Sequence, residues 1–123
     1  MTERRRKVGK IGEQAAISHL EQLGYEIVDT NYRCPLGEID IIAREGGSIV
    51  FVEVRTKTGS SFGMPEESIT AEKARRLKRL ALYYLQSVFR RAVPGRFDLV
   101  AVMLDRNSHE VVSLNHIKNI LPG

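Results

Sequence analysis

Two acidic residues interrupt apolar segments that otherwise have the composition of β-strands. Asp40 lies within the segment Ile39–Ala43, and Glu53 lies within Ile49–Val54. Strands are depleted in aspartate and, less strongly, in glutamate. A carboxylate among buried neighbours is costly unless a metal ion, a cation or a bound proton compensates its charge. Two such residues on successive strands, followed by the basic Arg55, predict a divalent-metal site for phosphodiester chemistry.

Strand periodicity indicates how these side chains can meet. Asp40 and Glu53 are separated by 13 positions across a tight turn at Gly46-Gly47, so we expect them on adjacent strands. Alternation places Glu53 and Arg55 on one face. If the register aligns the two carboxylates, they point at one spot. Carboxylate oxygens, water and a substrate phosphate form the shell that Mg²⁺ prefers, and Mg²⁺ or Mn²⁺ would activate water and stabilise charge on the phosphate.

Three further charged residues could join this site, each with an ordinary alternative. Glu13 lies at the margin of an apolar helical stripe and could reach the sheet, or it could be a solvated glutamate in the first turn. Lys73 falls on the buried arc of the second helix and could supply a cation, or it could extend into water. Lys57 shares the strand parity of Arg55. His19 is interpreted as a core histidine with a backbone partner, and Cys34 as incidental.

The elements that must position these residues follow from hydrophobic periodicity and turn signals. The pattern predicts an α/β protein of order α-β-β-β-α-β-β, with a central mixed sheet flanked by helices. Its first three strands should be antiparallel, and its third and fourth parallel. We expect a single domain, 1–123, with a disordered basic arm at 1–7 and a mobile loop at 56–69. The predicted helices are 8–23, 71–89 and a turn at 117–121; the predicted strands are 25–32, 38–44, 48–55, 97–104 and 111–114.

Composition and charge narrow the classes of protein that the chain can belong to. The 123 residues are 42% hydrophobic, which is typical of a globular domain. No segment reaches the length of a membrane span, and no apolar segment of a signal peptide follows the basic N-terminus. One cysteine excludes an internal disulfide, which fits a cytoplasmic location.

The net charge of +4 is unevenly distributed, which suggests a nucleic-acid partner. We expect basic residues of the N-terminal arm and of the second helix to contact phosphates without base specificity. The alternative is a solvated helix face. The helix residues assigned to this role are Arg75, Arg76, Lys78 and Arg79.

Several segments together resemble a known family. Gly37-Glu38-Ile39-Asp40 followed by Phe51-Val52-Glu53-Val54-Arg55 is similar to the Asp…Glu-x-Lys core of the PD-(D/E)xK nuclease superfamily. The wider set resembles the YraN family of small bacterial endonuclease-like proteins. That set adds Gly9-x-x-Gly12-Glu13-x-x-Ala16, Gly24-Tyr25, Asn31-Tyr32-Arg33, Phe62-Gly63, Lys73 and Arg96-Phe97-Asp98.

The resemblance implies a restriction-endonuclease-like core, similar to that of Holliday-junction resolvases. It implies Asp40 and Glu53 as metal ligands, with the carbonyl of Val54 as a third and Glu13 as a contributor. Arg55 stands where the superfamily has its catalytic lysine, and arginine lacks a compact, titratable ammonium. Lys57 or Lys73 could supply that function instead, or catalysis could be weak or absent.

Three hypotheses follow from these observations. The first is an Mg²⁺- or Mn²⁺-dependent endonuclease acting on DNA, including branched or single-stranded DNA, as a monomer or a homodimer. The second is a nucleic-acid-binding module that has a nuclease fold but no catalytic activity. The presence of Arg55 in place of the superfamily's catalytic lysine favours this hypothesis. The third is a structural or partner-binding protein in which Asp40, Glu53 and Arg55 form a buried ion network.

Overall fold

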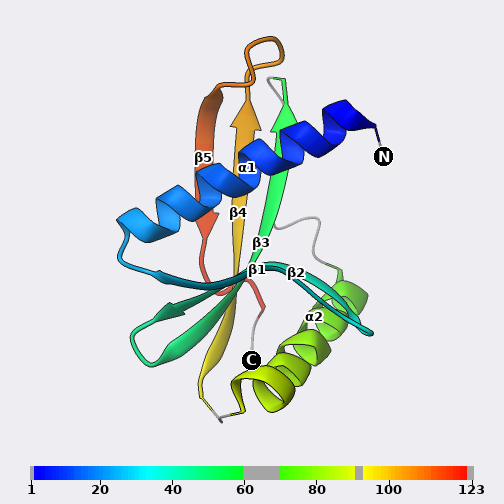
Figure 1. Ribbon diagram of the computed structural model, residues 1–123, viewed down its shortest axis with the longest axis vertical. Coiled ribbons are helices and arrows are strands. Elements are labelled where there is room, and N and C mark those ends of the chain that lie inside the picture. Colours follow the sequence, from blue (N-terminus) through cyan, green and yellow to red (C-terminus); the bar gives the residue numbers. More distant parts are fainter. Residues whose placement is uncertain (1, 60–69, 91–92, 122–123) are drawn as a thin grey trace.

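A five-stranded mixed sheet and two helices make up the computed structural model, which describes residues 2–59, 70–90 and 93–121 (Figure 1). This confirms the mixed α/β class and the predicted order of elements. The bounds are α1 Glu3–Gln22, β1 Glu26–Cys34, β2 Gly37–Glu45, β3 Ser48–Thr58, α2 Ala71–Tyr84, the π-helical turn η2 Leu85–Phe89, β4 Gly95–Leu104 and β5 Val111–Ile117.

The strands lie in the order β1-β2-β3-β4-β5. The pairs β1–β2, β2–β3 and β4–β5 are antiparallel, whereas β3 and β4 are parallel. Both predictions about strand direction are therefore confirmed. The parallel pair is the longest, running from Ile49 beside Gly95 to Thr58 beside Leu104.

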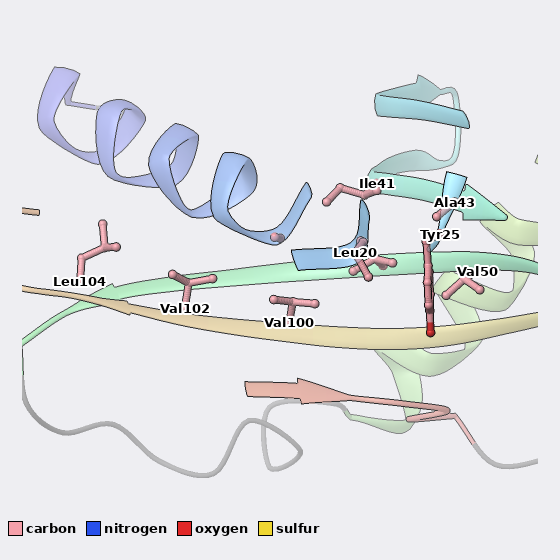
Figure 2. Close-up of a cluster of buried hydrophobic side chains, with 10 residues drawn as sticks. Leu20, Tyr25, Ile41, Ala43, Val50, Val100, Val102 and Leu104 are labelled. Carbon is pink, nitrogen blue, oxygen red and sulfur yellow. The ribbon is translucent and has the colours of Figure 1, made fainter. Parts of the chain in front are cut away.

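The two helices cover opposite faces of the sheet. Val50 and Val52 of β3 belong to a core with α1, whereas the alternating Ile49 and Phe51 belong to a core with α2. In Figure 2, Leu20 of α1 lies among aliphatic side chains of β2, β3 and β4. The α2 core contains Leu77, Leu80, Ala81 and Tyr84, which follow helical spacing. Within the described ranges, neither helix combines the length and apolar content that a bilayer crossing requires.

Several predicted boundaries need correction. The helix α1 begins at Glu3, where the side chain of Thr2 accepts a hydrogen bond of 3.2 Å from the Arg5 amide. Residues 3–7 are therefore helical instead of a disordered arm, because the cap satisfies a free amide of the first turn. β3 extends through Thr58 into the predicted loop, and residues 60–69 of that loop lie outside the described residues. The predicted helical turn at 117–121 is not helical over its described length.

The sheet forks in the middle of the molecule. β2 pairs with β3 as far as Ile41 beside Val52. Beyond that point, β2 stays with β1 down to Gly37, while β3 stays with β4 up to Thr58. In Figure 1 the β1–β2 hairpin turns away from the upper halves of β3 and β4. The next residues on the two diverging strands are Asp40 and Glu53.

Candidate functional site

Asp40 occupies the opening of this fork. Ile39 packs in the core with α2 and Ile41 in the core with α1, so regular alternation is interrupted around Asp40. Asp40 lines a concavity on each side of the sheet, and it shares the one on the α2 side with Glu53. Asp40 Oδ2 accepts a hydrogen bond of 2.8 Å from the backbone amide of Val54. That amide lies beyond the last β2–β3 pair. The carboxylate thus replaces a strand partner and is fixed in place by the backbone of β3.

The surroundings of Asp40 disfavour its negative charge. Burial is the largest cause and raises the pKa of Asp40 to about 6, against the opposing effect of the Val54 amide. The neighbouring carboxylates Glu13, Glu53 and Glu38 raise this pKa further. Negative charge therefore accumulates at the fork, which is the electrostatic condition that favours a bound cation.

Glu53 is paired on one oxygen and unpaired on the other. Its Oε1 lies 2.5 Å from the ammonium nitrogen of Lys73, and each side chain is 20% exposed. Its Oε2 is buried and has no hydrogen-bond partner within the part of the chain that the structure describes. The first turn of α2 positions Lys73, since the Thr70 hydroxyl accepts from the Lys73 amide at 3.1 Å and caps the helix. An orphaned carboxylate oxygen is costly, and a cation bound at this atom would satisfy it.

The helix α1 brings Glu13 to the opposite side of the fork. A Cβ added to Gly12 would lie 1.8 Å from the hydroxyl oxygen of Thr56, so only glycine permits this approach of α1 to β3. The Asn31 side-chain amide donates to Glu13 Oε1 at 3.1 Å. A concavity of about 780 Å³ lies between the first turns of α1 and β3, and its lining includes Glu13, Asp40 and Lys57. A smaller one of about 210 Å³ on the other side is lined by Asp40 and Glu53.

The remaining predicted residues are placed less centrally. Arg55 is half-buried on β3, lines neither of these two concavities and forms no ion pair within the described residues. The four α2 cations assigned to phosphate binding are exposed and also line neither concavity; they are Arg75, Arg76, Lys78 and Arg79. Their roles remain predictions.

The fork suits a hard cation held by two carboxylates rather than a complete protein cage. No cluster of three or more histidine, cysteine, aspartate or glutamate side chains suited to a metal occurs within the described ranges. What fits is the unpartnered Oε2 of Glu53 beside Asp40, whose charge is disfavoured by neighbouring acids. Mg²⁺ commonly takes one or two carboxylates and completes its shell with water and phosphate.

A second buried polar cluster, centred on Asp98, was missed by sequence reasoning. The Asp98 side chain is fully buried and accepts from Arg96 Nε at 3.0 Å and Nη2 at 3.2 Å, and from the Asn119 amide at 3.0 Å. His116 Nε2 lies 2.8 Å from Asp98 Oδ2. Burial would raise the pKa of Asp98, but these hydrogen bonds outweigh it and hold that pKa below its ordinary value. The available signal was the one that identified Asp40, an acid within an apolar strand.

The same cluster corrects the interpretation of His19. Its Nε2 lies 3.0 Å from Nδ1 of His116, so its partner is a side chain of β5 and not the backbone. Burial, followed by repulsion from His116, lowers the pKa of His19. The two rings therefore link α1 to β5 and, through His116, to Asp98.

Fold and site together define a mixed α/β protein with two carboxylates and a lysine at a fork in its sheet. Residues 12–102 match the model of the Uncharacterised protein family UPF0102, and the chain belongs to this family, which confirms its resemblance to the YraN family. A UPF0102 protein of Moorella thermoacetica is 55% identical over 109 residues, 86% of this chain and 88% of the relative. One from Caldicellulosiruptor saccharolyticus is 47% identical over 115 residues, covering 94% and 97%.

Proposed function

We propose that this protein is a metal-dependent endonuclease that hydrolyses phosphodiester bonds in DNA, including branched or single-stranded DNA. The proposal includes a restriction-endonuclease-like core of the PD-(D/E)xK type. The observation that carries it is the fork itself, where Asp40 and Glu53 are the first residues beyond the last β2–β3 pair and an oxygen of Glu53 is buried without a partner among the described residues. A purely structural ion network would be expected to satisfy that oxygen.

Each residue has a role that follows from its contacts. Asp40 and Glu53 would hold Mg²⁺ or Mn²⁺. The family resemblance alone adds the Val54 carbonyl and Glu13 as further oxygen donors. When bound, the cation would supply Lewis-acid stabilisation of the charge that develops on the phosphate. The hydrogen bond from the Val54 amide fixes the orientation of Asp40, and Lys73 fixes that of Glu53. Asp40 must be ionised to bind a cation, so binding should strengthen as the pH rises through its pKa of about 6.

Lys73 is the best-placed candidate for the lysine function that Arg55 cannot fully replace. It reaches Glu53 from the first turn of α2, whereas Arg55 forms no ion pair within the described residues. An ammonium group beside the carboxylates can stabilise a phosphate oxyanion and position a water molecule. We therefore expect Lys73→Ala to reduce cleavage by about 10²-fold or more. Arg55→Ala should have a smaller effect.

The decisive experiment is cleavage of linear, nicked, single-stranded and four-way DNA in Mg²⁺ or Mn²⁺. We expect activity in the native protein and loss of it in Asp40→Asn and Glu53→Gln. Glu21→Gln, which makes the same change at an exposed helix position, is the matched control. Full activity in both site variants would rule out this site.

A catalytically inactive nucleic-acid-binding module is the alternative. Two observations favour it, namely the Arg55 exchange and the Lys73–Glu53 ion pair, which already compensates one of the two acids. It predicts salt-dependent DNA binding with no cleavage in any metal. The structural hypothesis, a buried ion network, predicts instead that calorimetry detects no Mn²⁺ binding that depends on Asp40 and Glu53.

A further inference from the structure

A basic groove leads away from the acidic fork along one side of α1. The concavity of about 780 Å³ that contains Asp40 also includes Arg4 and Arg5 of α1 and Lys57 of β3. A second concavity of about 640 Å³ shares Arg4 and is lined by Lys7, Arg106 and His109. Figure 1 shows the first turns of α1 and the β4–β5 turn at the same end of the sheet.

Arg106, which lines the second concavity, also approaches the end of β3. A Cβ added to Gly59, just after β3, would lie 3.3 Å from a guanidinium nitrogen of Arg106. The Arg106 head group thus lies over the end of β3, next to Thr58, which lines the first concavity. The turn that carries Arg106 is well ordered, since Asp105 Oδ2 accepts from the amides of Asn107 at 2.9 Å and Ser108 at 2.8 Å. The backbone from which the Arg106 side chain extends is therefore set by the fold.

Charge is segregated along this groove. Its inner end contains the acids Glu13 and Asp40, whereas its outer part contains one acid, Glu3, within the described lining. Five permanent cations from three separate segments face the groove; they are Arg4, Arg5, Lys7, Lys57 and Arg106. A row of cations that ends at Asp40, one of the two proposed cation ligands, suits a polymer carrying a negative charge on each unit.

We propose that this groove binds the phosphate backbone of one DNA strand and guides it to the fork, which it reaches at Asp40. The inference rests on the proposed nuclease function for its direction, since the acid pair would receive the phosphate to be cleaved. Arg4 and Arg106 form a binding site remote from the reacting phosphate, so the protein contacts several nucleotides beyond it. The proposed binding surface is then on the α1 side, whereas Arg75 and Arg79 lie on α2, which covers the opposite face of the sheet.

Binding can be measured without cleavage, in EDTA, with a labelled oligothymidylate and fluorescence anisotropy. For Arg4→Ala/Arg106→Ala we expect at least about tenfold weaker binding. The slope of the logarithm of the binding constant against the logarithm of salt concentration should become shallower by about 1 to 2. The matched control is Arg6→Ala/Lys10→Ala, which removes two exposed cations of α1 that line neither concavity. Arg4→Lys/Arg106→Lys should retain most of the affinity, which separates lost charge from a folding defect.

The outcomes separate this inference from the proposed function. Three results would refute DNA binding in the groove. They are equal binding by all variants, equal loss of affinity in the test and control pairs, and loss of affinity only in Arg75→Ala/Arg79→Ala. Groove-dependent binding without cleavage on any substrate would keep the groove and reject the nuclease. Cleavage that needs Asp40 and Glu53 but is unaffected by the Arg4 and Arg106 substitutions would support the nuclease and reject the groove as the DNA-binding surface.

Discussion

Asp40 shows how one residue can be costly to the fold and useful to the site. It is ionised at physiological pH although burial and three nearby carboxylates oppose that charge. Natural proteins retain such destabilising groups mainly at functional positions. The sequence revealed this residue because aspartate conflicts with its apolar neighbours. It did not reveal that the Val54 amide would hold the carboxylate, since that contact exists only where the sheet forks.

Asp40→Asn should therefore stabilise the metal-free protein at alkaline pH. The native pKa is raised from 3.8 to about 6, so ionisation progressively lowers stability as the pH rises through that interval. Asparagine keeps the acceptor for Val54 without the charge. We expect a gain of about 1–3 kcal/mol in the free energy of unfolding at pH 8, and little gain near pH 4. Urea unfolding in EDTA measures both values.

Asp29→Asn provides the comparison for this prediction. Asp29 also accepts a backbone hydrogen bond, from Thr30 at 2.8 Å, but it is exposed. Its substitution should change stability little at either pH. A destabilised Asp40→Asn protein at pH 8 would show that the charge at the fork is compensated in the native state.

Between elements, the spacing of α1 from the sheet decides where Glu13 lies. The helix contacts β3 through Gly12 and Thr56. A methyl group on residue 12 would overlap the Thr56 side chain and push the helix away from the strand. The periodicity of α1 predicted which residues of the helix are buried. It did not decide whether Glu13 belongs to the site or extends into solvent. What resolves its position is the close approach at Gly12, which depends on the fold of two distant segments.

Gly12→Ala should destabilise the protein despite the better helix propensity of alanine. We expect a net loss of about 1–3 kcal/mol from overpacking against Thr56. Gly9→Ala is the matched control, because nothing lies within 4 Å of a Cβ added there, and it should gain up to about 1 kcal/mol. Thermal and urea unfolding compare the two. Equal stabilisation by both substitutions would contradict the proposed contact.

The Asp98 cluster joins the elements β4, β5 and α1 and should contribute strongly to their mutual stability. Asp98 of β4 contacts His116 of β5, which contacts His19 of α1. Arg96 of β4 donates to Asp98 and also to Tyr25, just before β1. Several of these partners are distant in sequence, 71 residues for Arg96 and Tyr25, which explains why periodicity could not find them. Asp98, the acid that these partners share, could nevertheless be noticed in the sequence because it lies within an apolar strand.

Asp98→Asn should cost about 2–4 kcal/mol at neutral pH, since it removes the buried charge that Arg96 compensates. The pKa of Asp98 is lowered below 3.8, so its contribution is full above that value and is lost as the pH falls through the native pKa. The native protein and the variant should therefore converge in stability in strong acid. Urea unfolding across this range tests the prediction, and a constant difference would refute it.

For the whole molecule, the sequence predicted the order and direction of the strands but not the fork. Alternating apolar residues identify strands and their faces, so the antiparallel meander and the parallel crossover could be expected. The fork depends on where the pairing between β2 and β3 stops, and Asp40 and Glu53 are the first residues beyond the last pair. The sequence placed the two acids on adjacent strands, but whether their faces align depends on a register that periodicity left open. The groove beside them could not be anticipated, because it unites α1, β3 and the β4–β5 turn.

Metal binding should stabilise the folded chain as a unit if the fork holds a cation. A ligand present at ten times its dissociation constant adds about 1.4 kcal/mol to the stability of a protein that binds it only when folded. For a chain of 123 residues this corresponds to a rise of about 3–6 °C in Tm. We expect Mn²⁺ or Mg²⁺ to raise the Tm of the native protein and of Glu21→Gln. The rise should be absent from Asp40→Asn and Glu53→Gln, and should shrink below about pH 6, where Asp40 is protonated. An equal rise in all four proteins would place the cation elsewhere on the molecule.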